Sequence, residues 1–451
     1  MRHPSDDCCV IGAGALGLTT ALRLAQRGHR VTVFERELLP GGLAAGFQVE
    51  SGAWLERFYH HIFRSDRAAI RLIDELGLTD RLQWTRPMTV TVSDGTTYQL
   101  DSALSLLRFA PISPISRLRM GAVLALLRLM PTPRLLEGRR AGPSLRRAMG
   151  EAGFEAIWGP LLRGKFGPFA DDVALPWFWA RVHDRSSELG YLKGGFQTLY
   201  DALCERIVEL GGEIQFGSSV QRIELKPDGL DVQFNRAAPE RQSDAPSAPV
   251  PGQPESPGTE TRRFKRVVST LATPVTCALA SDLGDAYRAA HGQIRALGAH
   301  CLILALDRPL TDSYWINIAD PGYPFLAAIE HTNLMPPSDY GGAHLVYLGN
   351  YRPHDDPLFT MSAGDVLTAF TPFIRRLNPE FDPSWVRSSW IFSAPNAQPI
   401  VDVGFQRSIP DIETPVKGLF MANMFQVYPH DRGQNYSVLL GERVARRVLE
   451  S

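Results

Sequence analysis

Three glycines near the start of the chain have the spacing of a dinucleotide-binding turn. Gly12, Gly14 and Gly17 form a G-x-G-x-x-G pattern around Ala15, directly after an apolar segment. In such a turn the first glycine permits a tight bend, the second lets the backbone approach a pyrophosphate, and the third allows close helix–strand packing. The free N–H groups at the start of the following helix favour phosphate charge. The pattern therefore predicts that these four residues bind the pyrophosphate of a dinucleotide.

The residues around this turn predict the strand–helix–strand unit that a dinucleotide site requires. An apolar strand covers Cys8–Ile11, and an amphipathic helix over Leu16–Arg27 follows the turn. The second strand, Arg30–Glu35, ends in an acid, where a carboxylate accepts hydrogen bonds from the adenosine ribose. We therefore predict that Glu35 and the adjacent Arg36 contact the cofactor. The alternative is a glycine turn with a surface glutamate.

A glycine doublet, Gly41–Gly42, follows shortly after this second strand. Here the chain resembles the superfamily of FAD-dependent amine oxidases, protoporphyrinogen oxidases and phytoene desaturases, whose fingerprint continues into a doublet close to the cofactor. The resemblance resumes at Tyr191–Phe196 and at Val220, where such proteins pair the backbone with the adenine. It implies a glutathione-reductase-like FAD domain, with Gly41, Gly42 and Val220 among the residues that contact FAD.

The end of the chain also resembles this superfamily, with one departure. A strand is expected over Gly418–Ala422, and the family usually reads Ala-Gly-Asp after it, where the aspartate holds the ribityl chain. This sequence has Asn423 at the point where that carboxylate is missing. Either the amide of Asn423 or the carboxylate of Asp431, from the following loop, is expected to take its place.

A helix is expected from Asn435 to Leu449. The resemblance implies that its first residues, Asn435, Tyr436 and Ser437, face the flavin pyrimidine, although the family usually has glycine where this chain has Tyr436. The dipole of a helix favours negative charge near its N-terminus by about 0.3–2 kcal/mol, which would stabilise reduced flavin. These three residues therefore join the expected cofactor contacts.

Two residues outside the cofactor segments are candidate catalytic groups. His61, in Phe58–Phe63, is similar to a histidine of UDP-galactopyranose mutases that sits near the isoalloxazine, where an imidazole donates a hydrogen bond or shuttles a proton. A packed pair with His60 is the alternative, and the spacing does not show which of the two faces inward. Lys165 is a candidate because amine-oxidase-type enzymes often hold a water at flavin N5 with a lysine. A solvated loop lysine is the alternative there.

The expected FAD-binding segments are separated by stretches rich in Trp, Phe, Tyr and Pro, which indicate a second domain. The fold class expected is α/β, with a doubly wound FAD-binding domain and an α+β substrate domain. One stretch rich in Pro, Ser, Glu and Gly has almost nothing to bury and is predicted to be a disordered hairpin insertion. The predicted boundaries are 1–82, 191–275 and 395–451 for the FAD-binding domain, 83–190 and 276–394 for the substrate domain, and 236–263 for the insertion.

Composition narrows the class of protein. The 451 residues carry 47 Lys+Arg against 48 Asp+Glu, so the net charge of -1 offers no polybasic argument for nucleic-acid binding. No clustered Cys/His pattern indicates a metal site. Cys8 and Cys9 are neighbours on a strand and must point to opposite faces, so we expect reduced thiols and a cytoplasmic protein. Neither a signal peptide nor an apolar run of about 20 residues is visible.

The stretch Ser102–Gly150 contains nine arginines and a single acid, Glu137. Its arginines punctuate apolar residues, as on a basic amphipathic surface that lies on anionic lipid, which would make the protein membrane-associated. The same charges would suit an access route for a phosphorylated or carboxylated substrate. Solvated arginines on core helices are the third interpretation. The sequence leaves the three open.

Taken together, these residues favour a FAD-dependent oxidoreductase that removes hydride from a C–N or C–C bond of a hydrophobic or anionic small molecule and passes it to flavin N5. An isomerase similar to UDP-galactopyranose mutase, in which reduced FAD acts as a nucleophile, is the first alternative. A flavoprotein partner that has lost catalysis is the second, and the missing ribityl carboxylate supports it. The sequence does not name the substrate, the electron acceptor or the oligomeric state.

Overall fold

Three stretches that lie far apart in the sequence build one parallel sheet. The computed structural model describes residues 7–236 and 258–451. Strand order in this sheet runs outward in both directions from the first strand, as in a doubly wound α/β fold. From edge to edge the strands are β10 (Glu213–Gln215), β2 (Arg30–Phe34), β1 (Asp7–Ile11), β14 (Arg266–Ser269) and β20 (Leu419–Met421).

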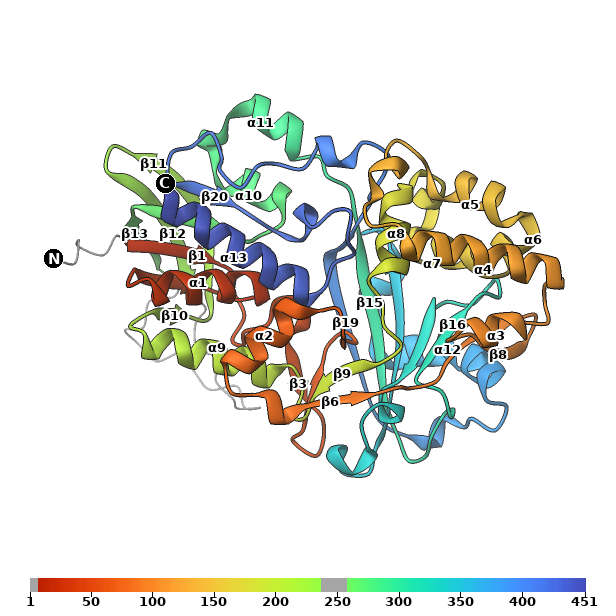
Figure 1. Cartoon of the computed structure of the whole chain (residues 1–451). Helices are drawn as coiled ribbons and strands as arrows, with labels where there is room; N and C mark the ends of the chain where they lie inside the picture. The colour runs from red at the N-terminus through yellow and green to blue at the C-terminus, as the bar shows by residue number, and fades with distance from the viewer. Residues whose placement is uncertain (1–6, 237–257) are drawn as a thin grey trace.

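Different layers cover the two faces of this sheet. Three helices pack on one face: α1 (Ala15–Gln26), α9 (Gln197–Glu209) and α13 (Gln434–Glu450). Helix α1 lies beside α13 (Figure 1). An antiparallel sheet covers the other face, with strands β11 (Ser218–Lys226), β12 (Gly229–Arg236) and β13 (Thr259–Phe264). Burial on both faces explains why the central strands are almost wholly apolar.

The adjacent cysteines of β1 show the two faces directly. Cys8 packs among the helices, whereas Cys9 packs against the antiparallel sheet. Successive side chains of a strand point to opposite faces, so this placement is the one that the sequence predicted. Burial raises the pKa of the Cys9 thiol, which keeps that thiol protonated.

The predicted insertion at 236–263 overlaps two strands. β12 ends at Arg236 and β13 begins at Thr259, and the two strands pair from Asn235 opposite Thr259 to Leu230 opposite Phe264. The prediction of disorder was wrong at both ends of the insertion, because backbone pairing orders those residues with little apolar burial. Residues 237–257 lie outside the described residues.

A seven-stranded sheet forms the other half of the molecule. Its strands come from 89–99 and 296–399, and all neighbours are antiparallel except β16 and β7. In order they are β19 (Val386–Pro399), β15 (Ala296–Leu306), β18 (His344–Arg352), β17 (Ala327–Glu330), β16 (Trp315–Ile318), β7 (Thr89–Ser93) and β8 (Thr96–Gln99). Helix α12 (Ala363–Leu377) packs on one face through Val366, Phe370 and Ile374.

A layer of helices lies at the end of the molecule opposite the C-terminus (Figure 1). Its core includes Met120, Phe166 and Trp177. The helices are α3 (Ala103–Leu107), α4 (Pro114–Leu129), α5 (Ala141–Met149), α6 (Glu151–Gly153), α7 (Gly159–Phe166) and α8 (Leu175–His183). Among the described residues, no helix combines the length and the apolar character that crossing a bilayer requires.

Short elements join the two halves. Strand β9 (Leu189–Leu192) pairs with β5 (Ile62–Phe63) on one side and with β6 (Leu82–Thr85) on the other. The remaining elements are β3 (Gly46–Gln48), β4 (Trp54–Glu56), α2 (Arg67–Glu75), α10 (Thr273–Leu279) and α11 (Gly284–His291). The division of the chain into two domains at the boundaries given above stays a prediction.

Candidate cofactor-binding and active site

Gly12 and Gly17 are required by the packing of the chain itself. Gly12 has a φ of +104°, and its N–H donates to the Phe34 carbonyl at 2.8 Å. A Cβ at Gly12 would lie 2.5 Å from Thr270 Oγ1, and a Cβ at Gly17 would lie 2.0 Å from the Gly12 oxygen. Two of the three predicted glycines therefore allow β1, α1 and the loop after β14 to meet closely.

Gly14 is different, because nothing in the chain requires a glycine there. Its backbone is extended, with a φ of -78°, and an added Cβ would meet only the Cα of Gly42, at 3.9 Å. Gly14 also forms a parallel bridge with Gly41, whose N–H donates to the Ala13 carbonyl at 2.8 Å. We call Gly12–Gly17 together with Gly41–Gly42 the glycine cradle. Bare backbone facing open space at Gly14 is what close approach of a pyrophosphate requires.

Glu35 lies at the edge of the cradle and is almost fully buried. Its carboxylate accepts from the N–H of Ala13 at 2.7 Å and from the N–H of Glu37 at 3.0 Å. Ser218, at the start of β11, donates its N–H to the Glu35 carbonyl at 2.7 Å. These bonds fix the acid beside the turn, whereas the neighbouring Arg36 is exposed and ion-paired with Glu37 at 3.4 Å. The predicted contacts of Glu35 and Arg36 with the cofactor stay predictions.

Val220 lies on β11, two residues after the segment that touches Glu35. It is buried and pairs with Phe234 of β12, next to an irregularity in the strand register. Because β11 is an edge strand of its sheet, half of its backbone groups have no strand partner. That placement leaves backbone available for the predicted pairing with the adenine, which stays a prediction.

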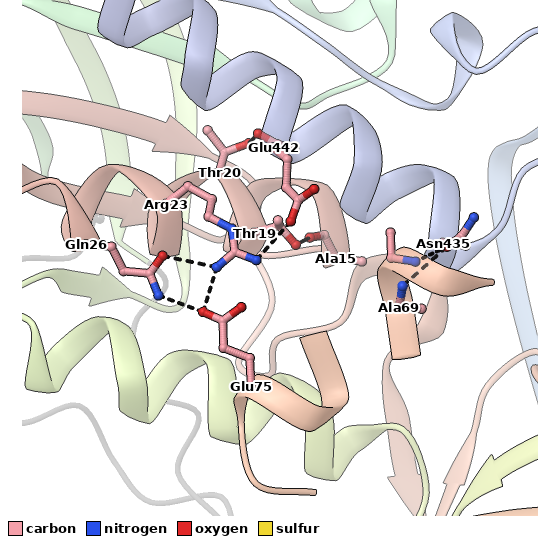
Figure 2. A network of polar contacts seen from close by, with 11 residues as sticks. Ala15, Thr19, Thr20, Arg23, Gln26, Ala69, Glu75, Asn435 and Glu442 are labelled. Carbon is pink, nitrogen blue, oxygen red and sulfur yellow. Dashed lines mark hydrogen bonds and ion pairs between the residues drawn. The ribbon is translucent and has the colours of Figure 1, made fainter. Parts of the chain in front are cut away.

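The last helix lies against the helix that begins at the cradle. The hydroxyl of Thr20 donates to the Gly441 carbonyl at 3.3 Å, and a Cβ at Gly441 would lie 2.7 Å from the Leu16 oxygen. Arg23 of α1 bridges Glu442 of α13, at 2.9 Å, and Glu75 of α2, at 2.6 Å. Figure 2 shows this network between the three helices. The cradle and the start of α13 are thus held in one assembly.

Among the first residues of α13, Asn435 and Ser437 make hydrogen bonds within the protein, whereas the side chain of Gln434 makes none among the described residues. Asn435 accepts from the N–H of Ala68 at 2.9 Å and of Ala69 at 3.2 Å, which caps α2 from a distance (Figure 2). The N–H of Ser437 donates to the Gly433 carbonyl in the first turn of the helix. Gln434 is 7% exposed, yet neither its amide nitrogen nor its amide oxygen has a partner among the described residues. A buried amide without partners fits the polar edge of a bound molecule.

Asn423 caps the turn after β20. Its amide donates to the Leu271 carbonyl at 2.9 Å and to Thr273 Oγ1 at 3.1 Å, and its oxygen accepts from the N–H of Phe425 at 3.0 Å. Both amide hydrogens are used within the protein, so a contact with a ribityl chain has only the oxygen left. That contact stays a prediction.

Asp431 pairs with cations from two helices. Its carboxylate contacts Lys165 Nζ of α7 at 3.1 Å and the Arg181 guanidinium of α8 at 3.3 Å. Lys165, Arg181 and Arg432 hold the pKa of this carboxyl well below its usual range, even though burial opposes ionisation. The Asp431 carboxylate, one of the two groups predicted to hold the ribityl chain, is therefore ion-paired within a charged cluster. Its contact with the cofactor stays a prediction.

Lys165 is buried, with 8% of its surface exposed, and belongs to a helix. The alternative of a solvated loop lysine is therefore wrong. Its Nζ lies 5.5 Å from the Trp177 ring and 5.1 Å from the Tyr351 ring. Burial lowers the pKa of Lys165 to about 7, and Asp431 limits that fall. The amine therefore exchanges its proton near neutral pH.

Two further arginines extend this cluster. The guanidinium of Arg432 donates to the Tyr351 hydroxyl and the Ala397 carbonyl, and it lies over the Tyr351 ring at 4.8 Å. Burial and the neighbouring Arg181 lower the pKa of Arg185 to about 9. We call the group that surrounds Asp431 the cationic cluster: Lys165, Arg181, Arg185 and Arg432.

Tyr436 joins the start of α13 to the end of α8. Its hydroxyl donates to Asp184 at 2.6 Å, and its ring stacks on His430 with centroids 4.4 Å apart. His430 contacts the same carboxylate at 2.7 Å. The tyrosine stands where the superfamily usually has glycine, and here it connects the helix to the loop that carries Asp431.

The two histidines both lie near the cationic cluster. Burial lowers the pKa of His60 to about 4, with a further contribution from Arg432. Burial lowers the pKa of His61 to about 3, and Arg185 contributes to it. His60 Nδ1 donates to the Phe58 carbonyl at 2.6 Å, and His61 Nδ1 lies 3.1 Å from the Tyr314 hydroxyl. Both imidazoles are therefore neutral at neutral pH. This geometry is compatible with a packed pair of histidines and also with a functional pair, so the role of His61 stays a prediction.

Comparison with known families decides which cofactor this geometry serves. A family model described as flavin containing amine oxidoreductase matches residues 17–449. The chain belongs to this family. The family membership and the flavin cofactor predicted from the sequence are therefore confirmed.

Individual relatives cover less of the chain. It is 28% identical over 257 residues to the 15-cis-phytoene desaturase of Narcissus pseudonarcissus, which is 50% of this chain and 44% of that protein. It is 46% identical over 57 residues to the phytoene dehydrogenase of Streptomyces griseus, which is 12% of this chain and 11% of that protein. The chain thus spans less than half the length of these relatives.

Solved structures match the fold along almost the whole chain. A candidate protoporphyrinogen oxidase from Exiguobacterium sp. 255-15 has a TM-score of 0.74 at 16% identity, and the match covers 100% of both chains. Reduced UDP-galactopyranose mutase has a TM-score of 0.76 at 15% identity, covering 99% of this chain and 96% of that one. Putrescine oxidase bound to putrescine has a TM-score of 0.70 at 15% identity, covering 99% and 100%. The flavin-dependent amine oxidase fold is therefore shown.

The residues of this family member fit FAD. The glycine cradle provides bare backbone for the pyrophosphate at Gly14, and Glu35 lies fixed beside it. Gln434 offers an unpaired amide donor and acceptor at the start of α13, where a flavin edge would find both. These three positions are the ones that we expect to hold the cofactor.

Sequence reasoning missed several residues of the site. Gln434 directly precedes the predicted helix start, so its position was a signal, but only the coordinates show that its amide has no partner. Arg181, Arg185 and Tyr351 lie in segments with no motif, and arginine is abundant in this chain. Nothing in the sequence indicates that the two arginines lie near Asp431 or that Tyr351 contacts Lys165 and Arg432.

Proposed function

We propose that the protein removes a hydride from a C–N or C–C bond of a small molecule that carries an anionic group. FAD, when bound, supplies the hydride acceptor. Membership of the amine oxidoreductase family supports redox chemistry at a flavin. The observation that carries the proposal is the buried cationic cluster beside two neutral histidines and the start of α13.

The cluster has more positive than negative charge. Lys165, Arg181, Arg185 and Arg432 surround Asp431, which is the one carboxylate paired with them in the described part of the chain. Asp184, at the end of α8, is engaged by Tyr436 and His430 instead. Unbalanced charge in a partly buried site is costly unless an anion compensates it. A carboxylate or phosphate of the substrate would restore the balance and set its orientation.

Lys165 and His61 would have different tasks in this reaction. With a pKa of about 7, the Lys165 amine is present in both protonation states near neutral pH, as a group that holds or moves a proton must be. His61 is neutral, and because its Nδ1 lies at the Tyr314 hydroxyl, Nε2 is the ring nitrogen that would bond a ligand. We assign proton exchange to Lys165 and positioning by hydrogen bonding to His61.

A second candidate is a non-redox isomerase that uses reduced flavin. The fold match to reduced UDP-galactopyranose mutase supports it, as does the placement of His61 near cationic side chains that suit a sugar nucleotide. A catalytically inactive flavoprotein is a third, and Asn423, where the family usually has an acid, is its sole support. The same purified protein distinguishes the three.

The test is anaerobic spectroscopy of the FAD-loaded protein. Putrescine, cyclohexylamine, phytoene and carboxylated amines are mixed with oxidised enzyme, and UDP-galactopyranose is mixed with dithionite-reduced enzyme. Bleaching of the flavin by a substrate, fastest for an anionic one, is expected. Turnover of the sugar nucleotide with no net electron consumption would establish the isomerase instead, and a protein that takes up no FAD would refute both.

The roles of the histidines need a matched pair of variants. His61→Ala is expected to slow flavin reduction by roughly 10- to 100-fold while FAD stays bound, because a positioned hydrogen bond is lost. His354→Ala removes a histidine from the surface, near the Ala296 carbonyl, and should change nothing. Equal reduction rates in the two variants would return His61 to a packing role.

A further inference from the structure

Helix α4 is apolar on its outer side as well as on its inner side. The inner side buries Met120 and Leu127. At about 100° per residue, four exposed residues fall within about 80° of arc on the opposite side. They are Ile115 (78% exposed), Leu118 (63%), Leu126 (64%) and Leu129 (82%). A surface helix normally carries polar residues there.

The neighbouring segments add to this exposed face. Helix α3 contacts α4 and exposes Leu104 and Leu107, and Leu135 is exposed in the short helical turn that follows α4. Of the fifteen large apolar side chains that are exposed in the described residues, seven therefore lie between 104 and 135. We call these seven the apolar stripe. Concentration of this kind marks an interaction surface rather than chance exposure.

Positive charge surrounds the stripe. Arg108, Arg134, Arg139 and Arg147 are exposed and have no ion-pair partner among the described residues. Three others bind only carbonyl oxygens, which orients them without neutralising them: Arg117 (on Leu107 and Ile112), Arg119 (on Arg147 and Ala148) and Arg128 (on Val182 and Arg185). The single acid of 102–150, Glu137, accepts from the Tyr428 hydroxyl.

We propose that the apolar stripe docks on an anionic lipid bilayer. Leucine and isoleucine side chains would enter the boundary between headgroups and acyl chains, and the arginines would meet lipid phosphates. A second copy of the chain is a poorer occupant, because a self-complementary contact would bring like charges together. A bilayer offers a partner for both parts of this surface: an apolar layer for the stripe and negatively charged phosphates for the arginines.

Docking would place the membrane next to the site. Arg128 of α4 donates to the Val182 and Arg185 carbonyls at the end of α8, at 3.2 and 3.0 Å. Trp179 Nε1 of α8 donates to the Met130 carbonyl, where α4 ends, at 3.1 Å. Helix α8 also carries Arg181 of the cationic cluster. Hydrogen bonds therefore link the helix that would dock to the helix that carries Arg181.

The test is co-sedimentation of the FAD-loaded full chain with vesicles of phosphatidylcholine, with and without phosphatidylglycerol. We expect binding only to vesicles that contain phosphatidylglycerol, and release at high salt. The triple variant Ile115→Gln, Leu118→Gln, Leu129→Gln should bind at least about tenfold more weakly, as should Arg108→Gln, Arg134→Gln, Arg147→Gln. All six side chains are exposed, so folding should be retained.

A matched control changes exposed apolar residues elsewhere. Val208→Gln with Leu225→Gln replaces side chains that are 55% and 45% exposed, far from α4 in the sequence, and should leave vesicle binding unchanged. Absence of wild-type binding to phosphatidylglycerol vesicles would overturn the proposal. Equal binding by the α4 triple and the control would do so as well. Self-association that the α4 triple abolishes, without vesicle binding, would assign the surface to a second copy of the chain.

Discussion

The glycine cradle, where we predict the cofactor, and the cationic cluster, where we propose the substrate, are built in opposite ways. The cradle works through missing side chains: Gly14 exposes backbone to open space, and Gly41 bonds the Ala13 carbonyl beside it. The cluster works through long charged side chains that come from α7, α8 and the loop before α13. One region offers fixed backbone dipoles, and the other offers buried charged side chains whose pKa values depend on one another.

This difference determines how each region tolerates change. In the cradle, the space around each Cβ separates Gly17, which the fold requires, from Gly14, where the chain itself leaves room for a side chain and where we predict contact with the ligand. In the cluster, no such separation exists. Removal of Asp431 would lower the stability of the fold and would also lower the pKa of Lys165. Substitutions in the two regions should therefore have different signatures.

The largest effect is expected in the cradle. Gly14→Val should fold and yet lose FAD, with affinity at least about 100-fold lower, or roughly 2.7 kcal/mol, because its side chain occupies the space that a pyrophosphate needs. Gly17→Val should fail to fold, since its Cβ would lie 2.0 Å from the Gly12 oxygen. Circular dichroism and the flavin absorbance of the purified proteins measure the two outcomes. A yellow, FAD-loaded Gly14→Val protein would contradict the placement of the phosphates.

A partial loss of stability, smaller than the failure to fold expected for Gly17→Val, is expected in the cluster. Asp431→Asn leaves Lys165 and Arg181 without their carboxylate, and loss of one partner of a buried pair costs roughly 3–5 kcal/mol. Urea unfolding measures this cost. Asp172→Asn is the matched control, because its pair with Arg140 is 3.7 Å long and exposed, so a change of about 0.5 kcal/mol or less is expected. Equal losses in the two variants would show that the cluster pair is no more than a surface contact.

The smallest effect concerns pH. In the folded chain the pKa of Lys165 is about 7, below its value of about 10.4 in an unfolded chain. Between these values the unfolded state binds a proton that the native state lacks, so stability rises with pH. The unfolding free energy of wild type minus that of Lys165→Met should therefore rise by up to about 1.4 kcal/mol per pH unit above pH 7. A flat difference would mean that Lys165 keeps its ordinary pKa.

Prediction from the sequence was most complete where one local pattern decides the structure. The strands at Cys8–Ile11 and Arg30–Glu35 and the helix at Leu16–Arg27 match β1, β2 and α1 to within a residue or so. Prediction was wrong for Thr259–Arg263, where strand pairing overrides a composition typical of disorder. The interpretation of Lys165 as a loop residue failed for a related reason, since burial depends on partners that are distant in sequence.

The sequence by itself determined the glycine turn, the acid that follows the second strand, the doublet, and the family to which they belong. Each depends on backbone conformation or on spacing along a few residues, which a linear pattern records. Only the tertiary structure decided that Asp431 meets Lys165 and Arg181, that the Gln434 amide has no partner, and that the apolar stripe faces outward. Charge pairing and burial are properties of distances in space, and residues separated by hundreds of positions acquire them only when the chain has folded.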